Sequence, residues 1–505
     1  MQRSPTPTMR RWLATAGLAL LVALLLFGLR GLAARITAGH LRHTADRQLA
    51  LIEHGQPLWQ WRLRQPHDLV AGRAFGAADV RRAGDGLRIR SRDGTPFELG
   101  LPVSGMLDPG HWPLLALRGE ADAPFRLGVA WRPRLGQPGC LGWQDAPVAA
   151  GPLRVVIDLR QLHWRGADGS SCAAPKRIEM LRLQLALAAG ASLRLDEVAL
   201  RREAPLPAPT RPSLQLSSDP AVASRQLADP ALPAAPWIAL PAGALAETQL
   251  VLRQLVWWQR PGALILPHGD TPTTADESGN HGWLAWVGTI GYLLALAGLA
   301  WWPPRLRRHR RWLELAACLA GPLWLVIGLR LGLRLSLPGL LCFAGALLFA
   351  AQAEWRQRPA DWHWLGDWRA WLMPFALLLP TLLLIAGYGG HCTPPTPGHV
   401  LVYMLWAILQ QWLMLAVVLR RLEGGRLHPA FAVLLTGLVF ALMHTPNGTL
   451  MQLCLLAELW WAWCFRRSRA LLPVAAAHAT CALLVEAGLV GGLLRSLEVS
   501  ARFFL

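Results

Sequence analysis

The pattern of hydrophobic and polar residues divides the chain into two kinds of region. Residues 12–29 form an apolar run near the start, and further apolar runs fill the C-terminal half. These runs have about 17 to 25 residues, the length that a helix needs to cross hydrocarbon. Between them, short stretches alternate apolar and polar residues, which is typical of half-buried strands. The pattern predicts a multi-domain protein with a polytopic α-helical membrane domain and an all-β domain.

The first apolar run predicts a membrane anchor at residues 12–33. It follows Arg3, Arg10 and Arg11 and is longer than most signal-peptide cores, so we interpret it as an uncleaved anchor whose N-terminus stays inside. The small residues "GLAA" at 31–34 leave cleavage open as an alternative. The region after the anchor is then expected to be exported.

Residues 35–203 predict this exported β-domain. Short strands separated by Gly and Pro turns favour a β-sandwich. The segment 178–200 resembles the last strands of galactose-binding-like jelly rolls, in which a paired hairpin closes the sheet. Such domains often bind sugars, which would make an envelope glycan the partner, but many are structural modules. No aromatic cluster indicates a sugar site here, so structural use or contact with a protein is favoured. The residues that share one apolar face are Phe125, Leu127, Val129 and Trp131 in one strand and Leu181, Leu183, Leu185 and Leu187 in another.

Residues 204–280 predict a linker and an interfacial segment. Nine prolines between Pro205 and Pro241 disfavour regular structure and indicate an extended chain. After them, Trp257 and Trp258 are expected at the headgroup level of a segment that lies along the membrane surface.

The remaining chain predicts eight further membrane spans, which makes about nine with the anchor. Residues 281–369 contain the second to fourth spans, and residues 370–495 contain the C-terminal core. Arginine-rich connections at 305–311, 354–369, 420–426 and 465–469 all fall inside if the first crossing goes outward, as the positive-inside rule expects. The expected spans are 282–302, 312–330, 336–353, 370–388, 399–419, 430–445, 449–465 and 470–493.

Composition supports a membrane protein and disfavours a nucleic-acid-binding one. The chain has 505 residues, 53% of them hydrophobic, and a net charge of +19 in which Lys176 is the only lysine. Much of the arginine lies beside apolar runs, so the charge indicates topology and no nucleic-acid partner is expected. Cys140 and Cys172 are the two cysteines of the soluble part, and a disulfide between them is possible if this part is exported.

Polar residues inside the last four spans are the candidates for function, because such groups are costly in hydrocarbon. A rise of about 1.5 Å per residue puts Gln411 about 13 Å, His478 about 12 Å and Glu458 about 10 Å from the inner ends of their helices. The same estimate puts His444 deeper, at about 22 Å, and Glu486 near the outer rim. Each residue alone is also explained as a hydrogen-bond partner between helices. The full set is Gln410, Gln411, His444, Glu458, His478 and Glu486.

Three of these positions resemble the motifs of the CAAX prenyl protease and bacteriocin-processing (CPBP) family of intramembrane proteases. "FALMH", residues 440–444, has the F-x-x-x-H form of the second motif, and Asn447 follows it. "LLPVAAAHA", residues 471–479, is similar to the third motif. "QQWLMLAVVLRRL" stands where the family has E-E-x-x-x-R. The resemblance covers roughly residues 370–490. It implies hydrolysis of a peptide bond by activated water, with His444 and His478 holding water or a divalent metal such as zinc.

The sequence departs from the first and third motifs. Gln410 and Gln411 replace the paired glutamates, Leu415 stands at the arginine position, and Ala482 replaces an asparagine. An amide does not accept a proton as a general base at neutral pH. Glu458, twenty residues before His478 where the family usually has a small residue, is therefore predicted to be the base in their place. The rival interpretation pairs Glu458 with an arginine such as Arg466 or Arg467.

The resemblance implies an intramembrane endopeptidase, and the topology predicts a bacterial inner membrane with a large periplasmic domain. The substrate would be a membrane-associated protein or lipidated peptide, and the catalytic set Glu458, His444, His478, Gln410, Gln411 and Asn447. An alternative is a catalytically inactive scaffold whose β-domain binds a protein or glycan. A transporter is less well supported, because the sequence has no internal repeat or paired broken helices.

Overall fold

Within the described residues, the computed structural model divides into two compact units. The first contains Met1–His40, Leu245–Leu250 and Glu277–Leu505, and the second contains Leu41–Ala244 and Val251–Asp276. The predicted fold class, a helical membrane region joined to a sheet-rich region, is confirmed. The residues that the structure describes are 7–103, 105–273, 282–304, 306–323, 337–356, 361–389, 394–425 and 427–490, together with 494 and 499.

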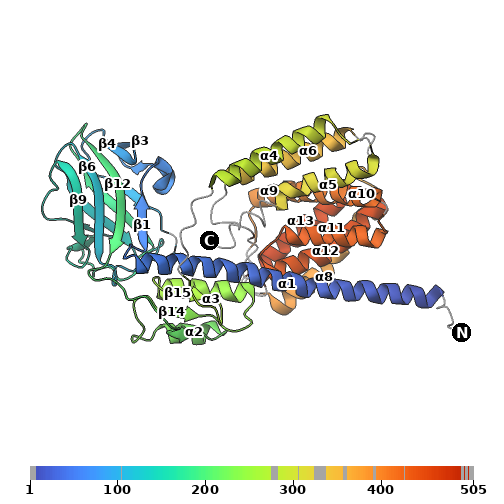
Figure 1. Cartoon of the computed structure of the whole chain (residues 1–505), viewed down its shortest axis with the longest axis horizontal. Coiled ribbons are helices and arrows are strands. Elements are labelled where there is room, and N and C mark those ends of the chain that lie inside the picture. Colours follow the sequence, from blue (N-terminus) through green and yellow to red (C-terminus); the bar gives the residue numbers. More distant parts are fainter. Residues whose placement is uncertain are drawn as a thin grey trace. The chain divides into compact units, whose positions relative to one another are not determined.

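The second unit is built on two antiparallel sheets, each with six strands among the described residues (Figure 1). Leucine-rich inner faces of both sheets form one hydrophobic core between them. The first sheet has the order β3 (Ala78–Ala83), β4 (Gly86–Ser91), β12 (Ser192–Arg201), β6 (Leu114–Ala121) and β9 (Gly151–Asp158), and β1 (Trp59–Arg62) also pairs with β12. The second has the order β10 (Trp164–Gly166), β8 (Cys140–Trp143), β7 (Arg126–Arg132), β11 (Met180–Ala186), β5 (Phe97–Leu101) and β2 (Ala74–Phe75).

The alternating strands were predicted correctly, but the closing hairpin was not. Leu127 and Val129 of β7 and Leu183 of β11 are fully buried, as their alternation indicates. However, β11 pairs with β5 and β7, whereas β12 pairs with β1, β4 and β6. The two strands belong to opposite sheets, because each has an apolar face that packs into the core between the sheets.

The predicted start of the β-domain at residue 35 is wrong. Helix α1 runs from Pro7 to Glu53, and the first strand begins at Trp59. Leu41, Ala45, Leu49 and Ile52 are buried at intervals of three and four residues, which is the period of a helix. This apolar stripe continues the anchor helix beyond its uninterrupted apolar run.

The segment 204–280 was predicted to be an extended linker and an interfacial segment, but it contains a small parallel sheet. Helices α2 (Pro220–Leu227) and α3 (Ala246–Gln259) accompany it, and α3 packs on the sheet through Leu252 and Val256. Proline is compatible with this fold because Pro220 occupies the first turn of α2, where no intrahelical N–H bond is needed, after the N-cap Asp219. The three strands are β13 (Leu214–Gln215), β14 (Trp237–Ala239) and β15 (Leu264–Leu266).

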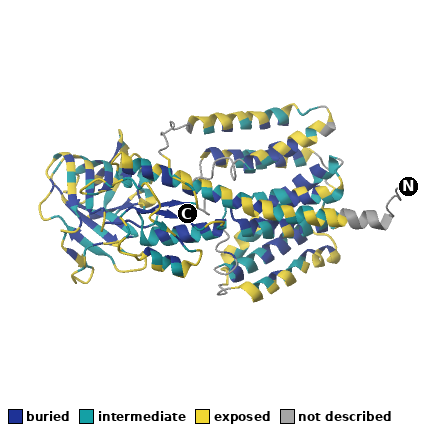
Figure 2. Ribbon diagram, turned by 60° about the horizontal axis from the view of Figure 1, so that its bottom comes forward, coloured by how far each residue is buried: buried dark blue, intermediate teal, exposed yellow. Residues whose placement is uncertain are grey.

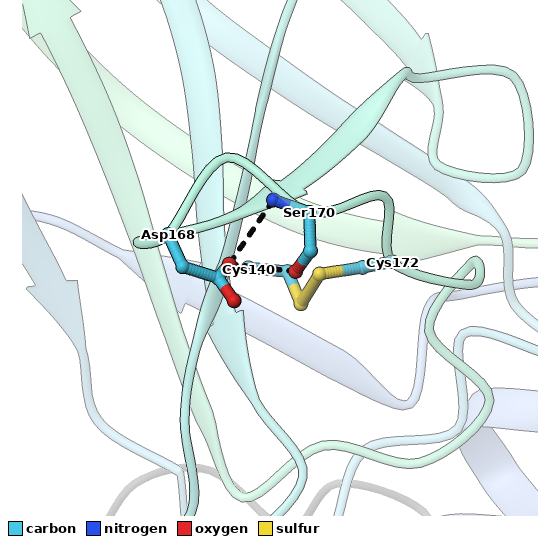
Figure 3. Close-up of a disulfide and its surroundings, with 4 residues drawn as sticks. All are labelled: Cys140, Asp168, Ser170 and Cys172. Carbon is cyan, nitrogen blue, oxygen red and sulfur yellow. Dashed lines mark hydrogen bonds between the residues drawn. A yellow bond between two sulfur atoms is a disulfide. The ribbon is translucent and has the colours of Figure 1, made fainter.

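A disulfide joins Cys140 and Cys172 in the second unit (Figure 3). Cys140 begins β8 and Cys172 follows β10, so the bond joins β8 to the segment after its partner, the edge strand β10. Beside it, the Ser170 hydroxyl and backbone N–H donate to Asp168, which holds the pKa of that carboxyl below its usual value. The sequence left this pairing open, and the structure contains it.

Replacing both disulfide cysteines, Cys140→Ser with Cys172→Ser, is expected to lower the free energy of unfolding of the β unit by about 3–4 kcal/mol. The bond closes a loop with a sequence separation of 32, and its loss frees that loop in the unfolded chain. Denaturant unfolding of the full-length protein, followed by tryptophan fluorescence, measures the change. Reductant should shift the wild-type midpoint and leave the variant unaffected; equal midpoints for both proteins without reductant would contradict the expectation.

The first unit is helical, and the boundaries of its helices agree with most of the predicted spans. Part of the span 312–330 lies outside the described residues, which end at Leu323 in that helix. The helices after α3 are α4 (Gly282–Trp301), α5 (Arg307–Leu323), α6 (Leu337–Arg356), α7 (Trp368–Leu372), η4 (Pro374–Leu377), α8 (Leu378–Tyr388), α9 (Pro397–Gln411), η5 (Trp412–Leu419), α10 (Arg420–Gly424), α11 (Pro429–Leu442), α12 (Gly448–Ser468) and α13 (Leu471–Leu489).

Within the described part of the chain, six helical segments are long and apolar enough to cross a membrane. Helix α11 is apolar but shorter, and α12 has lower mean hydropathy because it contains Gln452 and Glu458. Large apolar side chains such as Leu379, Leu383 and Leu405 are exposed on these helices, and Figure 2 shows exposed positions along them. Exposed apolar surface of this extent fits contact with lipid.

Buried ion pairs join the helices at the arginine-rich end of α10. Arg421 is 5% exposed and contacts Glu314 of α5 at 3.3 Å and Glu354 of α6 at 2.7 Å. Arg420 also contacts Glu354, at 2.8 Å. These carboxylates compensate the charge of the buried guanidinium, which would be costly alone. The contacts hold α5 and α6 against the helix that carries the glutamine pair.

Candidate active site

Gln410 and Gln411 end helix α9, immediately before the π-helical segment η5. Gln411 is fully buried, whereas Gln410 is partly exposed. Successive residues of a helix point about 100° apart, so the two amides do not face the same neighbours. π-Helical turns are rare in proteins, and those that exist often lie at functional sites. Here the π-helical segment begins at the residue that follows the buried amide.

The Gln411 amide joins a carboxylate and an imidazole from two other helices. Its Nε2 donates to Glu458 Oε2 of α12 at 2.9 Å and contacts His478 Nδ1 of α13 at 3.2 Å. All three side chains are buried, with at most 5% exposed. The structure thus brings together the three residues that the depth estimate placed at one level.

Hydrogen bonding assigns different tautomers to the two histidines. An amide NH₂ only donates, so His478 Nδ1 accepts from Gln411 and a neutral His478 carries its proton on Nε2. His444 Nδ1 lies 2.7 Å from the carbonyl oxygen of Phe440, which only accepts, so its Nε2 has a free lone pair. His478 therefore offers a donor at Nε2, and His444 offers an acceptor.

Aromatic rings surround His478 and place His444 near it. The Phe440 ring lies 4.8 Å from the His444 ring and 5.5 Å from the His478 ring, measured between centroids. Trp461, one helical turn after Glu458, lies 4.9 Å from His478, and Tyr403 lies 6.5 Å from it. The F-x-x-x-H spacing thus sets the orientation of His444 through the Phe440 carbonyl and brings the Phe440 ring against both imidazoles.

His444 was expected deep inside a helix, but α11 ends at Leu442 and His444 lies in the turn that leads to α12. The next motif residue, Asn447, is the N-cap of α12, and its Oδ1 accepts from Leu450 N at 3.1 Å. This geometry explains an asparagine after the histidine, because Asn is a strong N-cap residue. Asn447 therefore has a clear structural role in fixing the turn that carries His444.

Three buried side-chain oxygens in this region have no donor among the described residues. They are the Oε1 atoms of Gln410, Gln411 and Glu458. Buried polar atoms are ordinarily hydrogen-bonded. The acceptors at Gln411 and Glu458 therefore fit a donor from outside the chain, such as water or a peptide N–H.

The rival interpretation, a Glu458 that only neutralises an arginine, is wrong. Arg466 contacts Glu423 at 3.1 Å, and the Arg467 guanidinium lies 4.2 Å from the centroid of the Trp463 ring. Glu458 instead accepts a hydrogen bond from the Gln411 amide. Its carboxylate belongs to the polar group around His478.

Glu486 is separate from this group, as predicted from its position near the rim. His399 Nε2 lies 2.8 Å from Glu486 Oε2, and both side chains are more than one third exposed. Glu486 is therefore a matched control carboxylate on the same helix as His478.

The donor set does not fit the zinc site that the resemblance implied. Catalytic zinc usually has three protein ligands. Among the described residues, no group of three His, Cys, Asp or Glu side chains converges on one point. His478 Nδ1 also faces the Gln411 amide donor. We therefore derive no step through a metal at His444 and His478.

The sequence interpretation missed Glu247, which contacts the start of α12, next to the turn that carries His444. It is 9% exposed, and its Oε1 accepts from Thr449 N, in the first turn of α12, at 2.7 Å. A Cβ atom on Gly448 would lie 3.3 Å from the same oxygen and 3.2 Å from Ala33 of α1. Gln452 also donates to the Leu26 carbonyl of α1. No local pattern indicates a contact between residues about 200 positions apart.

Glu247→Ala is expected to loosen the first turn of α12, because Thr449 N–H loses its acceptor. Loss of a cap costs about 1 kcal/mol, which corresponds to roughly fivefold faster amide exchange. Glu247→Gln keeps an acceptor oxygen and should lie closer to the wild type. Hydrogen exchange at residues 448–451 measures the effect; identical exchange in the wild type and Glu247→Ala would show that the contact does not hold the turn.

The fold and the buried polar group define a polytopic membrane protein with a carboxylate, an amide and two imidazoles between its C-terminal helices. Residues 391–484 match the family described as Rce1-like, type II CAAX prenyl endopeptidase. The matched segment contains both glutamines, both histidines and Glu458. The match supports the similarity of this segment to the CPBP family that its motifs indicated.

None of the curated proteins compared with the chain matches it. Among solved structures, a family 11 carbohydrate-binding module from Clostridium thermocellum, in complex with a beta-1,3-1,4-mixed-linked tetrasaccharide, shares 13% identity with a TM-score of 0.20, over 26% of this chain and 86% of that one. A family two carbohydrate esterase from Cellvibrio japonicus shares 9% identity with a TM-score of 0.16, over 46% and 83%. At these scores neither likeness assigns a ligand to this chain.

Proposed function

We propose that the protein is an intramembrane endopeptidase that hydrolyses a peptide bond in a membrane-associated protein or lipidated peptide. One observation carries the proposal: the Gln411 amide lies within hydrogen-bond distance of both Glu458 and His478 in a buried site. Peptide hydrolysis needs a proton acceptor for water and a donor for the reacting carbonyl or the leaving amine. The group supplies both.

The roles follow from the atoms that each side chain offers. Glu458 accepts the proton of the attacking water, and Gln411 Nε2 holds the carboxylate in place. His478, with its proton on Nε2, donates to the carbonyl oxygen or the leaving nitrogen. His444 Nε2 accepts a hydrogen bond from the same water. Gln410 positions the substrate. Asn447, as the N-cap of α12, fixes the turn that carries His444.

The proposed location is a bacterial inner membrane, with the β unit in the periplasm. The arginine-rich connections follow the positive-inside rule if the first crossing goes outward. The Cys140–Cys172 disulfide also fits an oxidising compartment outside the cytoplasm. The substrate then meets the site within the bilayer, where water is scarce and polar groups interact strongly.

The test compares the membrane proteomes of cells that produce the wild type or the double variant His444→Ala with His478→Ala. One or a few membrane proteins should accumulate as longer precursors in the variant. The variant must be present in membranes at the wild-type level. Identical peptide patterns in the two strains would reject the endopeptidase.

A catalytically inactive scaffold is the second candidate, and the amides at the glutamate positions favour it. A scaffold requires a folded helical core but no proton acceptor. Under that function the histidine variants leave every precursor processed, while deletion of the β unit still removes the binding of its partner. The proteome comparison therefore separates the two functions.

A further inference from the structure

The outward side of the first β-sheet is rich in arginine. Side chains of a strand alternate between two faces, so residues next to the core leucines point outward. Arg88 is exposed between the buried Leu87 and Ile89, and Arg154 is exposed beside the buried Leu153. We call this side the arginine face. Its arginines are Arg62, Arg81, Arg88, Arg90, Arg118, Arg154, Arg194 and Arg201.

The register places arginines directly beside one another. Arg88 of β4 pairs with Arg81 of β3 on one side and with Arg194 of β12 on the other. In the adjoining strands, Arg118 of β6 pairs with Arg154 of β9 (strands labelled in Figure 1). Neighbouring strands are about 4.8 Å apart, and like charges opposite each other destabilise a sheet. Elsewhere on the same face acidic residues stand opposite arginines, with Asp79 opposite Arg90 and Glu120 opposite Arg194.

Carboxylates neutralise part of the arginine face. Glu197 contacts Arg118 at 3.0 Å and Arg201 at 3.8 Å, and Glu120 contacts Arg194 at 3.3 Å. In the part of the chain that the structure describes, no carboxylate contacts the remaining exposed arginines of the strands. These are Arg62, Arg81, Arg88, Arg90 and Arg154, and Arg90 Nε donates to the Gly190 carbonyl oxygen at 3.1 Å.

A cleft of about 550 Å³ adjoins this face. Arg62, Arg118, Glu197 and Arg201 line it together with residues of the loop after β12. Arg202 also lines the cleft, and its guanidinium lies 5.6 Å from the centroid of the Trp112 ring. The row of charges therefore ends in a concave site that contains a further arginine.

We propose that the arginine face and its cleft bind an acidic peptide segment, in which Asp or Glu side chains take the unpaired guanidinium groups. Arginine forms bidentate hydrogen bonds with carboxylates, and arginine clusters are a recurring means of binding acidic motifs. The outward ladder positions between β3 and β9 carry no aromatic residue on which a sugar ring would stack, so peptide is favoured over glycan. If the acidic segment is part of the protease substrate, that assignment rests on the proposed function. The binding of an acidic peptide does not depend on it.

The test measures binding of a fluorescent peptide of alternating glutamate and glycine to full-length protein in uncharged detergent. The variant combines Arg81→Gln, Arg88→Gln and Arg154→Gln. A matched control, Arg73→Gln with Arg126→Gln and Arg165→Gln, removes the same charge elsewhere in the β unit. We expect binding to weaken roughly tenfold or more in the first triple variant, to stay within about twofold in the control, and to weaken with salt.

Equal loss in both triple variants, or absence of binding to the wild type, would overturn the proposal. Stronger binding of polygalacturonate than of the peptide would assign the face to an anionic glycan instead. Glu458→Gln should bind the peptide as the wild type does. A failure of the proteolytic assignment is thus distinguishable from a failure of this one.

Discussion

Glu458→Gln should reduce cleavage of a membrane precursor by roughly 10²–10⁴-fold, the usual contribution of a general base. The substitution keeps the size of the side chain and an oxygen that accepts from Gln411, but it removes the proton acceptor. Protein folding should change little, because the shape of the buried site is conserved. The rate is measured with purified full-length protein and a precursor identified in the proteome comparison.

The matched control for this variant is Glu486→Gln. Glu486 lies on α13 with His478, but it contacts His399 and is partly exposed. The substitution removes a carboxylate from the helix that carries His478, but it does not change any group that contacts Gln411. Its rate should remain within about threefold of the wild type, since exposed ion pairs contribute little. Equal losses in both variants would indicate a general effect of charge instead of a base at Glu458.

Gln411→Glu should also lose roughly 10²-fold in rate, although it restores a glutamate of the family motif. The new carboxylate would lie where Gln411 Nε2 now donates to Glu458 at 2.9 Å. Two carboxylates at this distance do not both ionise, and the donor to His478 Nδ1 is weakened. The same cleavage assay measures the loss.

Combining Gln411→Glu with Glu458→Gln restores one amide and one carboxylate at the same contact. This double variant should be at least about tenfold faster than Gln411→Glu alone, because the repulsion is removed. A Gln411→Glu variant faster than the wild type would place the base on α9 and contradict a base at Glu458. A base at Glu458 predicts a slower Gln411→Glu variant and a base on α9 predicts a faster one, so the cleavage rate decides between them.

The sequence predicted the candidate site better than it predicted the linking segments. Long apolar runs and the few polar residues within them determine where helices lie and which residues share a depth. This is why the depth of each residue along its helix is enough to group Gln411, Glu458 and His478. The position of His444 was estimated less well, because its helix ends at Leu442 and the depth estimate assumed that the helix continues.

The errors lie where tertiary contacts override local pattern. Prolines after residue 204 indicated an extended chain, yet the apolar residues between them form a small sheet that α3 covers. The partner sheet of β12 could not be predicted, because an alternating strand fits either sheet of a sandwich. The Glu247 contact with Thr449 joins distant parts of the chain, and neither residue stands in a motif. Single-sequence patterns contain no information on such pairs.

We propose that Glu458 is the catalytic carboxylate, in place of the missing glutamate pair. The most direct measurement compares the membrane proteomes of three strains, which produce the wild type, Glu458→Gln, or His444→Ala with His478→Ala, at equal protein levels. We predict that the same precursors accumulate uncleaved in both variant strains. Accumulation in the histidine variant together with complete processing by Glu458→Gln would contradict the claim.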